Sequence, residues 1–104
     1  MANSVWHLAL KSEELEIGKI QELQLGTNFF CVLRRKDGIF AFAPQCPHAG
    51  GLFSEGCLDS KGNVECPLHQ YRFNPANGYN VSGEGYHLKT YPIKEENGCI
   101  YLQF

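Results

Sequence analysis

The sequence lacks any long apolar run and any strongly charged tract. No stretch approaches the roughly 18 consecutive apolar residues that a membrane-spanning helix needs. The start, from Met1 to Trp6, lacks the basic and then apolar pattern of a secretory signal. The formal net charge is only -2, and the basic cluster Arg34-Arg35-Lys36 is more typical of a solvated hairpin end than of a phosphate site. We therefore expect a cytoplasmic protein with neither a nucleic-acid nor a membrane partner.

Recognisable catalytic motifs are also missing. The sequence has no catalytic-triad pattern, no phosphate-binding loop and no paired-histidine helix of the kind found in zinc proteases. Its 104 residues, 43% of them hydrophobic, are enough for one domain with a real core, so we expect residues 1–104 to form a single domain.

The cysteine count does not favour a disulfide framework. Five cysteines is an odd number, and three of them, Cys31, Cys57 and Cys99, have no matched spacing. Cys31 and Cys99 lie in strand-like runs and are expected to be small core residues. Cys57 is interpreted as a plain loop cysteine.

The remaining two cysteines each stand close to a histidine. Cys46-x-His48 and Cys66-x-x-His69 place one thiol and one imidazole in each of two short segments, separated by residues 49–65. These donors match either a Cys₂His₂ zinc site or a binuclear iron–sulfur cluster with both cysteines on one iron and both histidines on the other. Zinc fingers usually group the cysteines in one arm and the histidines in the other, so the mixed arms favour the cluster.

The two arms and their surroundings resemble the Rieske proteins. The resemblance extends to three further segments: Gly50-Gly51, Tyr71-Arg72-Phe73-Asn74 and the Asn77-Gly78 turn. It implies that a 2Fe-2S cluster is bound by two thiolate ligands, Cys46 and Cys66, and two imidazole ligands, His48 and His69. Two thiolates with two neutral imidazoles leave the oxidised site neutral, and a neutral site accepts an electron more easily than an anionic one.

The resemblance is to stand-alone ferredoxins of ring-hydroxylating dioxygenase systems. It implies an electron carrier, not an enzyme by itself, that passes one electron from a reductase to an oxygenase or another redox enzyme. Two alternatives remain: the small subunit of a nitrite reductase-like enzyme, which shares the fold but in many members lacks the ligands, and a non-redox module with structural zinc.

Several positions depart from the respiratory-chain Rieske proteins. Those proteins carry a cysteine in each loop that together form a bracing disulfide, and the corresponding residues here are Gly51 and Leu68. A glycine commonly follows the second histidine, where this chain has Gln70. The covering third loop, residues 80–86, contains two glycines but no proline, so its rigidity is not assumed.

The other histidines and tyrosines have simpler interpretations. His7 and His87 have no partner at ligand spacing and are expected at the surface or at a strand edge. Tyr86 and Tyr91 suit strand packing as well as a docking role.

The hydrophobic pattern along the chain is that of β-strands. Apolar, β-branched and aromatic runs predict strands at residues 4–10, 19–25, 28–34, 39–43, 63–67, 71–73, 87–93 and 99–104. Asp37-Gly38 and Asn97-Gly98 predict hairpin turns, and Ser12 could cap one helical turn. We expect an all-β fold, a small antiparallel β-sandwich or barrel of the Rieske type with the two cluster-binding loops at one end.

Overall fold

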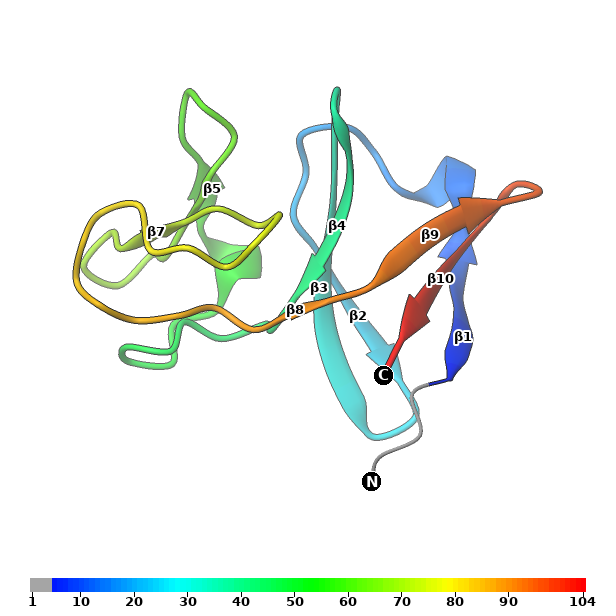
Figure 1. Cartoon of the computed structure of the whole chain (residues 1–104), viewed down its shortest axis with the longest axis horizontal. Helices are drawn as coiled ribbons and strands as arrows, with labels where there is room; N and C mark the ends of the chain where they lie inside the picture. The colour runs from blue at the N-terminus through cyan, green and yellow to red at the C-terminus, as the bar shows by residue number, and fades with distance from the viewer. Residues whose placement is uncertain (1–4) are drawn as a thin grey trace.

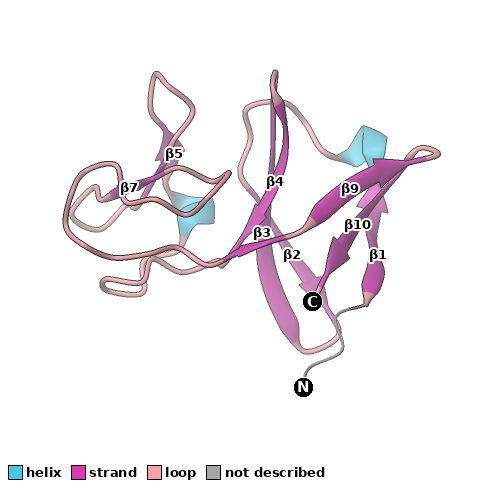
Figure 2. Cartoon of the chain, in the orientation of Figure 1, coloured by secondary structure: helices cyan, strands magenta, loops and turns pink. Residues whose placement is uncertain are grey.

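The residues that the structure describes form three antiparallel sheets arranged as a large and a small lobe (Figure 1). The computed structural model describes residues 5–104, so the start of the first predicted strand, at Ser4, lies outside the described residues. Within them, helical structure consists of two 3₁₀ turns, η1 (Ser12–Glu14) and η2 (Phe53–Glu55), as Figure 2 shows. The predicted all-β antiparallel class is confirmed.

The large lobe contains two sheets. One has the order β1 (Trp6–Lys11), β10 (Cys99–Gln103), β9 (Ile93–Glu96). The other has the order β2 (Gln21–Leu25), β3 (Asn28–Arg35), β4 (Gly38–Phe42), β8 (Thr90–Tyr91). The small lobe carries the third sheet, with the order β5 (Cys57–Leu58), β6 (Val64–Glu65), β7 (Arg72–Phe73).

Strand β3 is buried on both faces, and this joins the two lobes. Successive side chains of a strand point to opposite faces of its sheet. Phe30 and Val32 pack with Ile100 and Leu102 between the two sheets of the large lobe. The alternate residues of β3, Cys31 and Leu33, enter the second core, which continues into the small lobe. A continuous apolar run is what a strand buried on both faces requires.

The second core ends at the candidate ligands. It contains Phe53, Val64, Phe73 and Leu88 together with both cysteines of the two arms. The small lobe is therefore packed around the floor of the candidate site. Cys31 is a core residue as predicted, and Cys99 is half-buried.

The predicted hairpins form, with one shift of register. Asn97 and Gly98 adopt positive φ angles of 52° and 78° and connect β9 to β10. In the β3–β4 hairpin Arg35 pairs with Gly38, so the turn residues are Lys36 and Asp37 and not Asp37-Gly38.

Three further details of the sequence interpretation were wrong. The helical turn is capped at Lys11, whose backbone N–H donates to the Glu14 carboxylate over 2.8 Å, and not at Ser12. The predicted strand over residues 87–93 is wrong at both ends: strand structure begins only with β8, and a second strand, β9, follows Pro92, which has no N–H to donate to a ladder. Cys57 is not in a loop but begins β5, which the sequence pattern did not reveal.

The basic cluster lies at the end of the β3–β4 hairpin, as predicted, and two of its charges are paired. The Arg34 guanidinium lies 2.8 Å from the Glu95 carboxylate, and that of Arg35 lies 2.7 Å from Asp37. The described residues, 5–104, contain no helix with the length and apolar character that crossing a bilayer requires.

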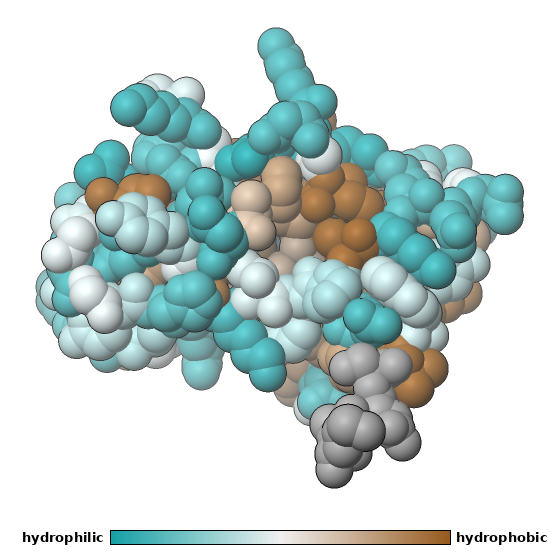
Figure 3. Space-filling model, viewed as in Figure 1, coloured by the Kyte–Doolittle hydropathy of each residue, from teal (hydrophilic) through white to brown (hydrophobic). Residues whose placement is uncertain are grey.

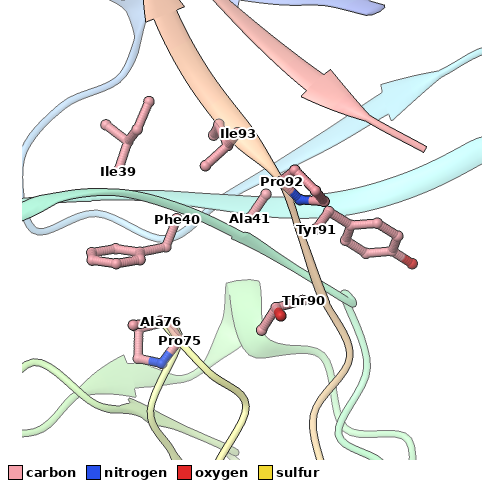
Figure 4. A pocket seen from close by; sticks show the side chains of 9 residues that line it. All are labelled: Ile39, Phe40, Ala41, Pro75, Ala76, Thr90, Tyr91, Pro92 and Ile93. Atoms are coloured by element: carbon pink, nitrogen blue, oxygen red, sulfur yellow. The ribbon is translucent and has the colours of Figure 1, made fainter. Parts of the chain in front are cut away.

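An apolar groove separates the two lobes. It is lined by β4 and the β8–β9 segment on one side and by Pro75 and Ala76 on the other (Figure 4). Ile39 and Ile93 lie in this region, where a brown patch is visible between β4 and β9 in Figure 3. No residue of the two cysteine–histidine arms lines the groove.

Candidate metal centre

The two arms form the tips of two hairpins in the small lobe. The first loop, residues 46–51, is closed by a hydrogen bond from the Cys46 N–H to the Gly51 carbonyl (2.8 Å). The second loop, residues 66–71, is closed in the same way by the Cys66 N–H and the Tyr71 carbonyl (2.9 Å). An antiparallel pair flanks each loop: Gln45 with Leu52 outside the first, and Glu65 with Arg72 outside the second. Each cysteine is the first residue of its loop.

The two cysteines lie together at the floor of the site. Cys46 is 2% exposed and Cys66 is fully buried, and their thiols are within hydrogen-bonding reach of each other. Burial raises the pKa of the Cys66 thiol, while a hydrogen bond from the Leu68 N–H to Cys66 Sγ (3.4 Å) acts in the opposite direction. A buried thiol pair of this kind binds a metal by exchanging its protons for the ion.

The two histidines form a second pair nearer the surface. The His48 and His69 rings lie 5.2 Å apart between centroids, with His48 half-buried and His69 exposed. His48 Nδ1 is buried and has no hydrogen-bond partner. Since buried polar atoms are nearly always satisfied, this nitrogen points to an additional partner such as a metal.

The donors are therefore arranged as two pairs. In the described part of the chain, no three His, Cys, Asp or Glu side chains are grouped closely enough to hold a single metal ion. Two thiols below and two imidazoles above suit a binuclear group that takes two protein ligands on each metal. On this observation the residues fit a 2Fe-2S cluster.

The second loop has an unusual backbone at its histidine. His69 and Gln70 have φ angles of 65° and 61°, in the left-handed region that costs residues with a Cβ about 1–2 kcal/mol each. A glycine would adopt this conformation without that cost. Gln70 adopts this conformation despite its Cβ, so the loop holds strain next to a candidate ligand.

Gly51 and Leu68, the positions that correspond to the bracing disulfide of respiratory-chain Rieske proteins, face each other. A Cβ added to Gly51 would lie 2.7 Å from Cys66 Sγ and 3.1 Å from the Leu68 side chain. The five cysteines form no disulfide with one another in the structure. Gly51 lets the first loop approach the buried thiol of the second loop directly.

The sequence model of the Rieske 2Fe-2S domain matches residues 5–92. The chain belongs to the Rieske 2Fe-2S family. Domains of this family bind a 2Fe-2S cluster, in agreement with the donor arrangement.

Two curated relatives show that related Rieske domains occur in different kinds of protein. The ferredoxin component of a 2,4-dinitrotoluene dioxygenase system from Burkholderia sp. is 30% identical over 99 residues, which is 94% of each chain. The cholesterol 7-desaturase of Bombyx mori is 30% identical over 105 residues. The chain spans only 23% of the desaturase, so that relationship concerns one domain of a larger enzyme.

Solved Rieske structures share the fold over nearly the whole chain. A structure of an oxygenase–ferredoxin complex of carbazole 1,9a-dioxygenase contains a chain with a TM-score of 0.82 and 27% identity, covering 96% of this chain and 94% of that one. A nitrite reductase small subunit from Mycobacterium tuberculosis has a TM-score of 0.85 at 22% identity, covering 99% and 97%. The latter likeness concerns the fold alone.

The third loop of this Rieske domain is ordered by one buried amide. Asn80 is 5% exposed and donates to the Arg72 carbonyl (3.1 Å) and the Glu84 carboxylate (2.9 Å). Its Oδ1 accepts the backbone N–H groups of Glu84 (2.8 Å) and Tyr86 (3.3 Å). Asn80 therefore connects β7, which follows the second loop, to the third loop. Its hydrogen bonds order the third loop, which contains no proline.

One neighbour of the site was missed by the sequence interpretation. Tyr86, at the end of the third loop, lies 5.4 Å from the His48 ring, and Tyr71 stacks on the same ring. Tyr91 instead packs edge-on against Phe30, as strand packing predicts. Spacing along the chain gives no signal for Tyr86, since the loop conformation alone brings it to His48.

The remaining titratable candidates lie outside the donor group. His87 is exposed, and His7 is in edge strand β1, stacked on Phe104. Cys57 is exposed, with Sγ 3.6 Å from the Glu65 carboxylate. Desolvation and then the charge of Glu65 raise the pKa of the Cys57 thiol, which disfavours the reactive thiolate.

Replacing Asn80 tests the order of the third loop. Asn80→Ala removes the hydrogen bonds that the Glu84 and Tyr86 N–H groups donate to the buried amide, so we expect it to lower the free energy of unfolding by about 1–3 kcal/mol in urea titrations. Amide hydrogen exchange at residues 82–86 should accelerate. Asn77→Ala is the matched control, because that exposed side chain accepts a single hydrogen bond, from the Tyr79 N–H. Equal effects of the two substitutions would contradict the role given to Asn80.

Proposed function

We propose that this chain is a one-electron carrier whose 2Fe-2S cluster is bound by Cys46 and Cys66 on one iron and by His48 and His69 on the other. The observation that carries the assignment is the pairing of donors on two facing loops, with the thiols buried and the imidazoles nearer the surface. The unpartnered Nδ1 of His48 supports an imidazole ligand at that position.

The cluster, when bound, supplies a centre that accepts and releases one electron. The protein's contribution is electrostatic and geometric. Two thiolates and two neutral imidazoles keep the oxidised site neutral, which favours reduction relative to an all-thiolate site. The buried cysteines isolate one side from water, whereas the exposed ring of His69 gives a partner protein a short electron path.

The partners we propose are a reductase that supplies the electron and an oxygenase, or another redox enzyme, that receives it. The ferredoxin component of the dinitrotoluene dioxygenase system matches this chain along 94% of both lengths, which supports a carrier of similar extent. We propose further that residues 1–104 act as a single domain in the cytoplasm. Besides the two proposed ligands, Cys31, Cys57 and Cys99 are free thiols, which suits a reducing compartment.

The small subunit of a nitrite reductase is the second candidate. The Mycobacterium tuberculosis protein supports it only through the shared fold. Retention of all four donors favours the carrier, because a subunit without an electron-transfer role would not need them. A structural zinc site is the remaining alternative, and it predicts a colourless protein without acid-labile sulfide.

The ligand assignment is tested by substituting each histidine. We expect the purified protein to contain iron and acid-labile sulfide in equal amounts and, once reduced with dithionite, to give a Rieske electron paramagnetic resonance (EPR) signal. His48→Ala and His69→Ala should each abolish that signal. His87→Ala is the control and should leave it unchanged, because His87 lies outside the donor group. Zinc without sulfide, or an unaltered signal in His69→Ala, would refute the assignment.

The carrier role is tested by reconstitution. Product formation by an oxygenase and reductase encoded near this chain should require the holoprotein and rise with its concentration. The isolated chain, supplied with reductant and aromatic substrate, should form no product, since the sequence shows no catalytic motif besides the cluster arms. Product formation by the isolated chain, or by the other two components at full rate without it, would count against the carrier.

A further inference from the structure

The first and second loops hold the four candidate ligands, yet they are not joined covalently. Gly51 and Leu68 occupy the facing positions of the missing disulfide. The floor of the site is fixed by the buried thiol pair and by the contact of Gly51 with Cys66. The histidines lie nearer the surface and need a different constraint.

The ring of Tyr71 supplies a contact between the loops at the level of the histidines. It lies nearly parallel to the His48 ring, with centroids 4.2 Å apart and an interplanar angle of 27°. His48 belongs to the first loop and Tyr71 closes the second, so the stack crosses from one loop to the other. The distance between Tyr71 and His69 is larger, 6.4 Å, with the rings inclined at 48°.

The third loop places another aromatic ring next to those of His48 and Tyr71. Tyr86 lies 5.4 Å from His48 and 5.9 Å from Tyr71. The Asn80 amide fixes the backbone N–H of Tyr86 and the carbonyl of Arg72, the residue that follows Tyr71. One buried side chain therefore holds the segments that carry both tyrosines.

We infer that Tyr71 is a positioning residue for His48: its stacked ring locks the orientation of the imidazole and braces the two loops where the disulfide is absent. This inference rests on the proposed function, because it takes His48 as a ligand. Aromatic pairs contribute about 0.5–1.5 kcal/mol beyond the area they bury. The stack also keeps water from one face of the imidazole.

A set of four variants of the holoprotein tests the inference. Tyr71→Phe keeps the ring and removes the hydroxyl, whereas Tyr71→Leu and Tyr71→Met keep an apolar side chain without a ring. Tyr79→Leu is the matched control, since Tyr79 is 65% exposed and makes no aromatic contact among the described residues. The readouts are the half-life of the visible cluster absorbance in the presence of a chelator and the EPR line widths of the reduced protein. Circular dichroism verifies that each variant is folded.

We expect Tyr71→Leu and Tyr71→Met to lose the cluster about two- to ten-fold faster than wild type, the range that corresponds to one aromatic pair. Their EPR lines should broaden, because the His48 ring would adopt a range of orientations. Tyr71→Phe and Tyr79→Leu should behave like wild type. Wild-type behaviour of both ring-free variants, or equal damage in Tyr71→Phe, would overturn the inference while leaving the proposed function intact. A wild-type protein without a Rieske EPR signal would overturn the proposed function and the inference with it.

Discussion

The contact between Gly51 and the buried Cys66 thiol is the constraint on which the site depends. A side chain at position 51 would come within 2.7 Å of Cys66 Sγ, so only glycine lets the first loop close over the second. This approach brings Cys46 and Cys66 together at the end of a core that also contains Phe53, Phe73 and Leu88. The thiol pair is thus part of the hydrophobic core, and a cofactor bound there would contribute directly to the stability of the small lobe.

The two histidines are held by backbone conformation and by ring contacts, and not by burial in the core. His69 and Gln70 adopt a strained backbone, and the His48 ring is confined by the rings of two tyrosines. Such an arrangement suits a carrier. The thiolate side stays dry and fixed, while an exposed imidazole edge remains available to a partner, and transient redox partners need only a small contact surface.

Much of this architecture was predictable from the sequence, because its signals are local. The paired Cys-x-His and Cys-x-x-His arms indicated two donors per loop, and the apolar runs predicted the strands of the large lobe except the division between β8 and β9. The short β5 was missed because Cys57 and Leu58 stand between Gly56 and Asp59, residue types that are depleted in strands. Tyr86 and the order of the third loop were missed for another reason. Both depend on Asn80, whose hydrogen bonds join residues from 72 to 86, and no spacing rule reports such contacts.

The central claim is that two histidines and two cysteines share one binuclear cluster. Pulsed EPR of the dithionite-reduced protein, with histidine as the only ¹⁵N-labelled residue, tests it most directly. The account predicts strong couplings from two histidine nitrogens and no contribution from His7 or His87. A reduced cluster without strongly coupled histidine nitrogen would contradict it.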